Sequence, residues 1–261
     1  MAKTALLIMA LAAAAAAPAE AGSAVVAQYK VEAANTTILR ALYQANIDGN
    51  SFTSSLSGKT AGISNFLKGV RLEMSAAGQM TGDGFLPGNF QNMKKKKHKD
   101  ARTTGINWAA DGTVKVITDK GAQPLPDGVA KALGKPSADP LTAILNIATM
   151  SAAKPCTGKL RVYDGKDVYD LGLALGAQVK LGGGKADGFR CTITYTPIAG
   201  RSFDQGEKDV DSYQAVFVPV VLNGASSPAY FPVQLVGKTM GVTYTVQAQS
   251  LTVDGAPQPV Q

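Results

Sequence analysis

The only histidine of the chain, His98, is the first residue to consider for catalysis. Hydrolysis by a serine or cysteine nucleophile needs a histidine that transfers a proton and a carboxylate that orients it. His98 instead lies between Lys97 and Lys99, in a strongly basic run that is typical of a solvated surface. The sequence also lacks a nucleophile motif of the G-x-S-x-G type. We therefore expect a solvated histidine, no catalytic residue and no cofactor.

Three aspartates, Asp164, Asp167 and Asp170, could supply the pair of carboxylates that glycoside hydrolysis requires. Asp164 stands before Gly165, however, where a tight turn favours aspartate for its own hydrogen bonds. Acidic residues beside a hairpin also favour solubility. A carboxylate-dependent hydrolase therefore remains the third functional alternative. One histidine, two distant cysteines and no clustered carboxylates offer no usual set of metal ligands.

A short basic run contains Lys94, Lys95, Lys96, Lys97 and Lys99 and supplies five of the seven excess positive charges. We favour an exposed edge strand or hairpin tip, where lysines prevent pairing with other molecules. The alternative is a contact for an anionic polymer. Successive strand residues alternate faces, so an extended run displays charge on both sides. No aromatic residue interrupts the lysines, so we expect no binding of nucleic acid.

The beginning of the chain has the organisation of a secretory signal peptide. A basic start at Lys3 precedes the apolar stretch 5–17, and small residues at Ala19 and Ala21 precede Gly22. This apolar stretch is too short to span a bilayer, which takes about 20 residues. We predict that residues 1–21 are cleaved between Ala21 and Gly22. The remainder, residues 22–261, is expected to form one exported domain without a transmembrane span.

The two cysteines agree with export. Cys156 and Cys191 are an even number in a chain predicted to reach an oxidising compartment, where disulfides persist. A disulfide between them is therefore expected. Two free buried thiols are the alternative.

Alternation of apolar and polar residues predicts a sheet. In GFRCTITYTP, residues 189, 191, 193 and 195 are apolar, and the residues between them are threonine or arginine. Similar segments recur about every ten residues, separated by turns such as Asp164-Gly165. This pattern favours one long meandering antiparallel sheet over βαβ units. The chain ends in VDGAPQPVQ, for which we expect a frayed tail.

One segment, residues 140–150, has the spacing of a helix. Asp139 can cap its first turn, Pro140 suits the first helical position, and one face would carry Leu141, Ile144, Leu145 and Ala148. We expect this short amphipathic helix to plug the concave side of the sheet. A movable lid over a ligand cavity is the alternative.

Several of these features occur together in one known family. The W-x-x-D-G turn after the basic run, the helix start DPLTAILNIA, the hairpin KLRVYDGKDVYDLGL and the strand CTITYTPIAG stand in one order. Over residues 29–246 the chain resembles the Gram-negative periplasmic proteins of domain of unknown function number three thousand one hundred and eight. The resemblance implies a curved, incompletely closed antiparallel sheet, an open barrel, clam or spiral, that holds a helix. It also implies a periplasmic location and no known reaction.

Two functions of different kinds follow as expectations. The first is a non-catalytic periplasmic protein that supports the integrity of the cell envelope, with a lipidic or apolar ligand in the concave sheet. The alternative is an electrostatic binder of an anionic envelope polymer or lipopolysaccharide that uses the lysine run. The sequence predicts no particular protein partner.

Overall fold

Antiparallel strands build most of the computed structural model, which describes residues 22–62, 69–150, 155–184, 186–201, 211–223, 225, 227–239 and 241–260. Two short helices, α2 (Asp127–Ala132) and α3 (Pro140–Thr149), accompany the strands. The strands are β1 (Ser23–Ala33), β2 (Thr36–Asp48), β3 (Ser51–Thr60), β4 (Val70–Thr81), β5 (Gly84–Lys96), β6 (Arg102–Trp108), β7 (Val114–Thr118), β8 (Gly121–Gln123), β9 (Gly158–Tyr163), β10 (Asp167–Leu181), β11 (Ala186–Gly200), β12 (Asp211–Val220), β13 (Ala229–Thr239), β14 (Val242–Val253) and β15 (Ala256–Pro257).

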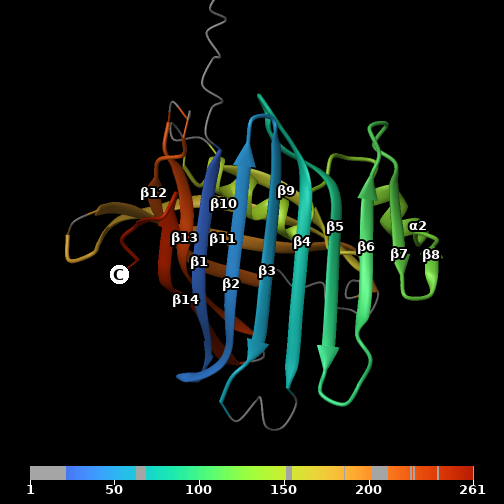
Figure 1. Cartoon of the computed structure of the whole chain (residues 1–261), viewed down its shortest axis with the longest axis horizontal. Helices are drawn as coiled ribbons and strands as arrows, with labels where there is room; N and C mark the ends of the chain where they lie inside the picture. Colours follow the sequence, from blue (N-terminus) through green and yellow to red (C-terminus); the bar gives the residue numbers. More distant parts are fainter. Residues whose placement is uncertain are drawn as a thin grey trace, which may run out of the picture.

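All fifteen described strands belong to one sheet. Its order is β8-β7-β6-β5-β4-β3-β2-β1-β14-β13-β12-β11-β10-β9, and β15 pairs only with β14. The pairing of β1 with β14 joins the two halves of the chain, whereas β8 and β9 are the two edge strands. Strands β1 to β6 stand side by side, and β9 to β11 cross behind them (Figure 1). The predicted long, curved and open antiparallel sheet is therefore confirmed.

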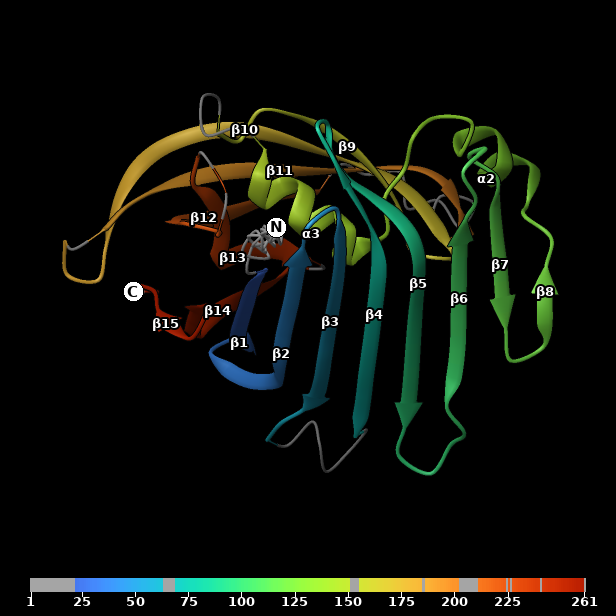
Figure 2. The same ribbon diagram turned by 45° about the horizontal axis from the view of Figure 1, so that its top comes forward.

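Helix α3 lies between the two halves of the folded sheet (Figure 2). Leu141, Leu145 and Ala148 are buried against the largest core cluster, and Ile144 packs against the same cluster. The helix also packs against a second cluster through Ile147. Because α3 is covered on several sides, its contacts favour the predicted plug over the lid.

Two polar side chains fix the position of α3. The carboxylate of Asp139 accepts hydrogen bonds from the backbone N–H of Leu141 at 2.8 Å and of Thr142 at 2.9 Å, as expected of an N-cap. Burial raises the pKa of Asp139 although these bonds act in the opposite direction. Asn146 donates to the carbonyl of Phe85 at 2.9 Å and accepts from its N–H at 2.8 Å. The helix is thus tied to β5 through the backbone as well as through apolar contacts.

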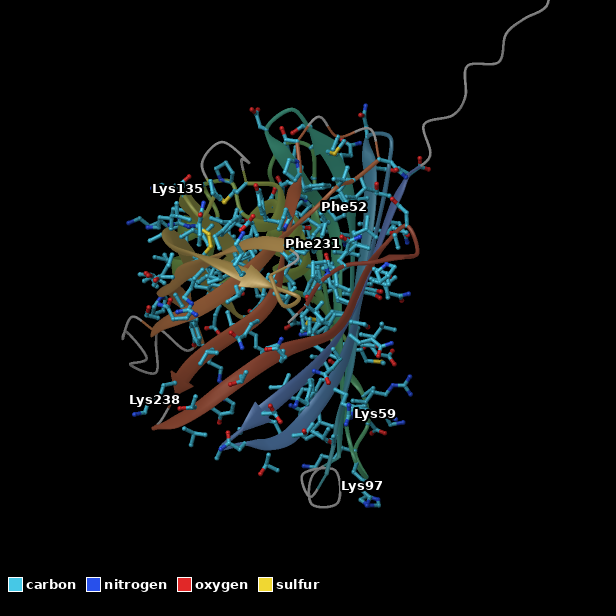
Figure 3. The ribbon with its side chains drawn as sticks, turned by 90° about the vertical axis from the view of Figure 1, so that its left-hand side faces the viewer. Phe52, Lys59, Lys97, Lys135, Phe231 and Lys238 are labelled. Atoms are coloured by element: carbon cyan, nitrogen blue, oxygen red, sulfur yellow. A yellow bond between two sulfur atoms is a disulfide. The ribbon has the colours of Figure 1, made fainter. Side chains whose placement is uncertain are left out.

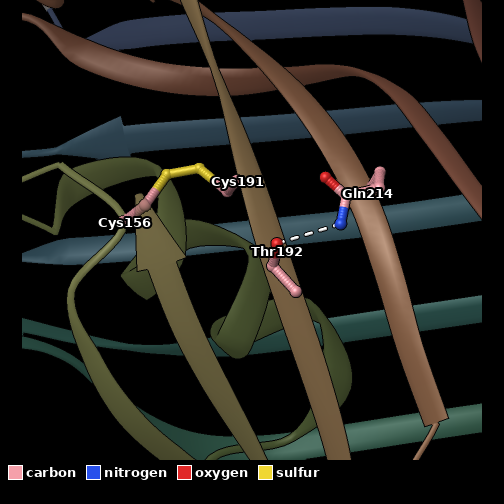
Figure 4. Close-up of a disulfide and its surroundings, with 4 residues drawn as sticks. All are labelled: Cys156, Cys191, Thr192 and Gln214. Atoms are coloured by element: carbon pink, nitrogen blue, oxygen red, sulfur yellow. Dashed lines mark hydrogen bonds between the residues drawn. A yellow bond between two sulfur atoms is a disulfide. The ribbon is translucent and has the colours of Figure 1, made fainter. Parts of the chain in front are cut away.

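The predicted disulfide joins Cys156, after α3, to Cys191 on β11, with the two Cα atoms 5.8 Å apart. On the neighbouring residue, the Thr192 hydroxyl accepts a hydrogen bond from Gln214 at 2.9 Å (Figure 4). The disulfide closes a loop with a sequence separation of 35. Such a crosslink stabilises a fold by about 2–4 kcal/mol.

The two ends of the domain meet beside β1. The Ala24 N–H donates to the Asp254 carboxylate at 2.7 Å, and the Gln258 N–H donates to the carbonyl of Leu251 at 2.8 Å. Residues 1–21, for which the sequence predicts a signal peptide, lie outside the described residues.

Candidate functional site

The basic run forms the end of β5 and the turn to β6. Lys97, His98 and Lys99 are exposed, and His98 has a φ of 61°, in the left-handed region that tight turns use. Lys97 lies at the lower tip of the molecule in Figure 3. The expectation of an edge strand is wrong, because β5 pairs with β4 on one side and with β6 on the other. The run is therefore at a hairpin tip within the sheet.

The lysines of β5 divide between the two faces of the sheet. Lys94 lies opposite Leu72, and Lys96 lies opposite Val70, so these two lysines share the inner face with the core. Lys95 lies opposite Arg71 on the outer face. Within one run, two charges therefore border the inner face and one belongs to the outer face.

Apolar side chains continue along the inner face from the core toward these lysines. They belong to four strands and are only partly buried. Val246 lies opposite Val31, and Val31 lies opposite Leu39. We call the five residues of this region the inner strip: Val31, Leu39, Val70, Leu72 and Val246.

The inner strip crosses β3 at Gly58. Gly58 lies opposite Leu72 on β4, and a Cβ atom at Gly58 would be 3.5 Å from Cδ2 of Leu39. The Leu39 side chain therefore lies beside Gly58, at ordinary van der Waals distance from a Cβ atom there. Apolar surface thus passes from β2 to β4 and ends at Lys94 and Lys96.

The inner face has two zones. Near α3 its aromatic side chains are almost fully buried, with Tyr43 and Phe90 1% exposed and Phe52 2% exposed. Phe52 and Phe231 are deep between the two halves of the sheet, whereas Lys59, Lys97 and Lys238 lie toward the opposite end (Figure 3). The inner strip lies beyond the buried zone, at the level of Lys94 and Lys96, which are directly opposite Leu72 and Val70.

The three aspartates that the sequence singled out have structural contacts. Asp164 accepts hydrogen bonds from the N–H groups of Lys166 at 2.8 Å and Asp167 at 2.9 Å, which form the turn between β9 and β10. Burial raises the pKa of Asp164. Asp170 binds Arg161 through both carboxylate oxygens, at 2.8 and 3.1 Å. Asp164 and Asp170 therefore each maintain the hairpin.

Two surface grooves are relevant to the hydrolase alternative. The larger, of about 780 Å³, is lined by residues that include Trp108, Leu86, Leu133 and Lys135. Among its described lining residues, Asp111 is the only one with a carboxylate. The second, of about 380 Å³, has no carboxylate among the described residues that line it. Within the part of the chain that the structure describes, neither groove therefore brings two carboxylates together.

Within the described ranges, no group of three or more histidine, cysteine, aspartate or glutamate side chains is placed to hold a metal ion. Among the helices that the structure describes, none is long and apolar enough to cross a membrane.

The sequence pointed to the lysines but not to the inner strip. Each residue of the strip belongs to an ordinary alternating strand, and only the pairing of distant strands brings the five residues together. The pattern of every second residue could have shown that Lys94 and Lys96 share a face. This pattern could not show which strands pair with one another, and so could not bring the five residues together.

Comparisons with known proteins concern the family and the fold. The family described as "Protein of unknown function (DUF3108)" matches residues 28–227. None of the curated proteins compared with the chain matches it. A similar solved structure is a beta-barrel-like protein of domain of unknown function DUF1849 from Brucella abortus, with a TM-score of 0.53 and 11% sequence identity. The similarity covers 90% of this chain and 98% of that chain, and it shows a shared fold.

Proposed function

Since this chain belongs to the family described as Protein of unknown function (DUF3108), we propose its function from its geometry. It is a non-catalytic periplasmic protein that supports the cell envelope by holding an anionic amphiphile. The apolar part of this ligand lies on the inner strip, and its charged head lies at Lys94 and Lys96.

One observation carries this proposal: a partly exposed apolar surface on the inner face ends at two exposed lysines. An acyl chain that leaves water gains about 0.8 kcal/mol for each buried CH₂ group. An exposed ion pair adds only about 0–1 kcal/mol, so the lysines orient the ligand more than they strengthen its binding. The arrangement therefore suits a long apolar chain with one anionic end.

Two further points support the proposed periplasmic location and the proposed non-catalytic role. The basic start, apolar stretch and small residues of positions 1–21 are typical of export. Asp164 and Asp170, two of the aspartates considered for hydrolysis, are engaged in the turn and in the ion pair with Arg161. A binding role in the periplasm fits both points.

Replacing Leu39 by glutamate is expected to weaken the binding of a fluorescent long-chain fatty acid by at least tenfold. The new carboxylate would have to be desolvated under the acyl chain, which is unfavourable for an unpaired charge. Titration of the purified protein by fluorescence measures the affinity, and circular dichroism checks that each variant is folded.

Leu42→Glu is the matched control, because Leu42 is on the same strand and has a similar partial burial but faces outward. It should leave the affinity within about twofold, since its side chain is not on the inner strip. Equal losses in the two variants, or no binding by the unaltered protein, would contradict the proposal.

The double variant Lys94→Gln/Lys96→Gln should weaken binding of the fatty acid but not of its uncharged methyl ester.

A further inference from the structure

Five basic side chains form one line across the outer face of the sheet. Each lies directly opposite the next on the neighbouring strand, and directly opposed residues of antiparallel strands point to the same face. We call this line the outer row: Lys30 opposite Arg40, Arg40 opposite Lys59, Lys59 opposite Arg71, and Arg71 opposite Lys95.

The outer row faces away from the core. Arg40 and Lys59 alternate with inward-facing residues of β2 and β3, such as the buried Tyr43 and Phe52. Four of the five row residues are exposed, and Lys30 is partly buried. The row crosses five strands and is about 19 Å long, because neighbouring strands lie about 4.8 Å apart.

Folding does not require this arrangement. Like charges directly opposite each other on a sheet are destabilising. Lys30 pairs with Glu32 at 3.1 Å and Arg71 pairs with Glu73 at 2.6 Å, but among the described residues no carboxylate forms an ion pair with the other three members. Protection of an edge does not explain the row, because every strand from β1 to β5 is paired on both sides.

The middle of the outer row lines a shallow groove of about 440 Å³. Arg40, Lys59 and Arg71 contribute to its lining together with neutral polar side chains that include Ser57 and Gln249. Guanidinium, ammonium, hydroxyl and amide groups are all donors of hydrogen bonds to anionic oxygens. The groove therefore combines positive charge with neutral donors.

We propose that the outer row binds a linear polyanion that lies across the strands, with its anionic groups following one another along the row. The row is one residue wide. Beside it on the same face lie the neutral Gln28, Leu42 and Ser57 and the acidic Glu73. A flat anionic membrane would bring charge against these residues as well, whereas a single chain meets only the cations. This site is separate from the inner strip and does not depend on it.

The probe for this site is long-chain inorganic polyphosphate, and the test variant is Arg40→Gln/Lys59→Gln/Lys95→Gln. Its affinity is expected to be at least tenfold lower than that of the unaltered protein. The logarithm of the binding constant should also fall less steeply with the logarithm of salt concentration, because fewer counterions are released. The binding constant is measured by titration at several salt concentrations.

A control of equal charge change is Lys115→Gln/Lys120→Gln/Lys131→Gln, whose exposed lysines belong to β7, the turn after it and α2. It should stay within about twofold of the unaltered protein, because long-range effects of net charge are weak at physiological salt. Equal losses in the two triple variants would overturn the proposal in favour of a net-charge effect. If Arg40→Gln/Lys59→Gln/Lys95→Gln lost binding to phosphatidylglycerol vesicles but still bound polyphosphate, the proposal would be overturned in favour of a membrane surface.

A second variant separates binding from stability. Lys59→Glu places a carboxylate between Arg40 and Arg71, so repulsion along the row is replaced by attraction. We expect the Tm to rise while the affinity for polyphosphate falls at least tenfold. An unchanged affinity in this variant would overturn the proposal.

Discussion

Replacing Asp170 by alanine is expected to lower the free energy of unfolding by about 3–5 kcal/mol. The Asp170 side chain is only 3% exposed and binds Arg161 at 2.8 Å and Lys159 at 2.7 Å. Arg161 also donates to the carbonyl of Ala132 at 3.0 Å, which ties the end of α2 to β9. Removing Asp170 leaves the Arg161 charge, 15% exposed, without its carboxylate. Urea unfolding followed by circular dichroism measures the loss.

Asp187→Ala provides the matched control on the neighbouring strand β11. Its ion pair with Lys180 is exposed, at 69% and 66% of the two side chains, and such pairs contribute about 0–1 kcal/mol. The two variants should therefore differ by at least about 2 kcal/mol. Similar small losses in both would show that the Asp170 pair does not hold β9, β10 and α2 together.

Acid should reduce the effect of Asp170→Ala. Burial alone would raise the pKa of Asp170, but hydrogen bonds from Arg161 and Lys159 outweigh burial and hold the pKa below its usual value. Because the pKa is lower in the folded state, the stabilisation is complete above the unfolded pKa, about 4, and is lost as pH falls through the folded value. The difference in free energy of unfolding between the unaltered protein and Asp170→Ala should be constant above about pH 5 and shrink below about pH 4.

Replacing Leu145 by alanine is expected to lower the free energy of unfolding by about 2–5 kcal/mol. Leu145 is 0% exposed and belongs to the largest core cluster, in the middle of α3. The helix packs against β3, β4 and β5 in one half of the sheet and against β9 and β13 in the other. A cavity in its buried face therefore weakens the packing between the two halves. Thermal and urea unfolding give the change.

Ile144→Ala on the same helix is the comparison. Ile144 is only partly buried, so its substitution removes fewer buried contacts. Its cost should be clearly smaller than that of Leu145→Ala. An equal or reversed order would mean that α3 does not pack on the sheet through the Leu145 face.

Local patterns predicted the elements well. The cap at Asp139 and the apolar spacing after it gave the helix of α3, which ends at Thr149. Alternation in GFRCTITYTP gave a strand with Phe189 and Cys191 on the buried side. These features depend on residues close together in the chain, where capping and side-chain alternation decide the structure.

Long-range pairing could not be predicted in the same way. The contact between β1 and β14 joins opposite ends of the described chain, and bulges such as that between Gln28 and Tyr29 change which residues oppose each other. The lysine run was expected on an edge strand or at a hairpin tip. It lies at the β5–β6 tip, because β6, β7 and β8 extend the sheet beyond β5. Both proposed binding surfaces depend on such cross-strand register, which alternation within one strand does not specify.

The proposed position of an amphiphile on the inner strip is tested most directly by photo-crosslinking. A long-chain fatty acid with a diazirine in its acyl part is bound to the purified protein, irradiated, and located by mass spectrometry of the peptides. We expect cross-links to the inner strip, chiefly at Val31, Leu39, Leu72 and Val246. Cross-links concentrated in the groove beside Trp108, or at Leu42 on the outer face, would contradict it.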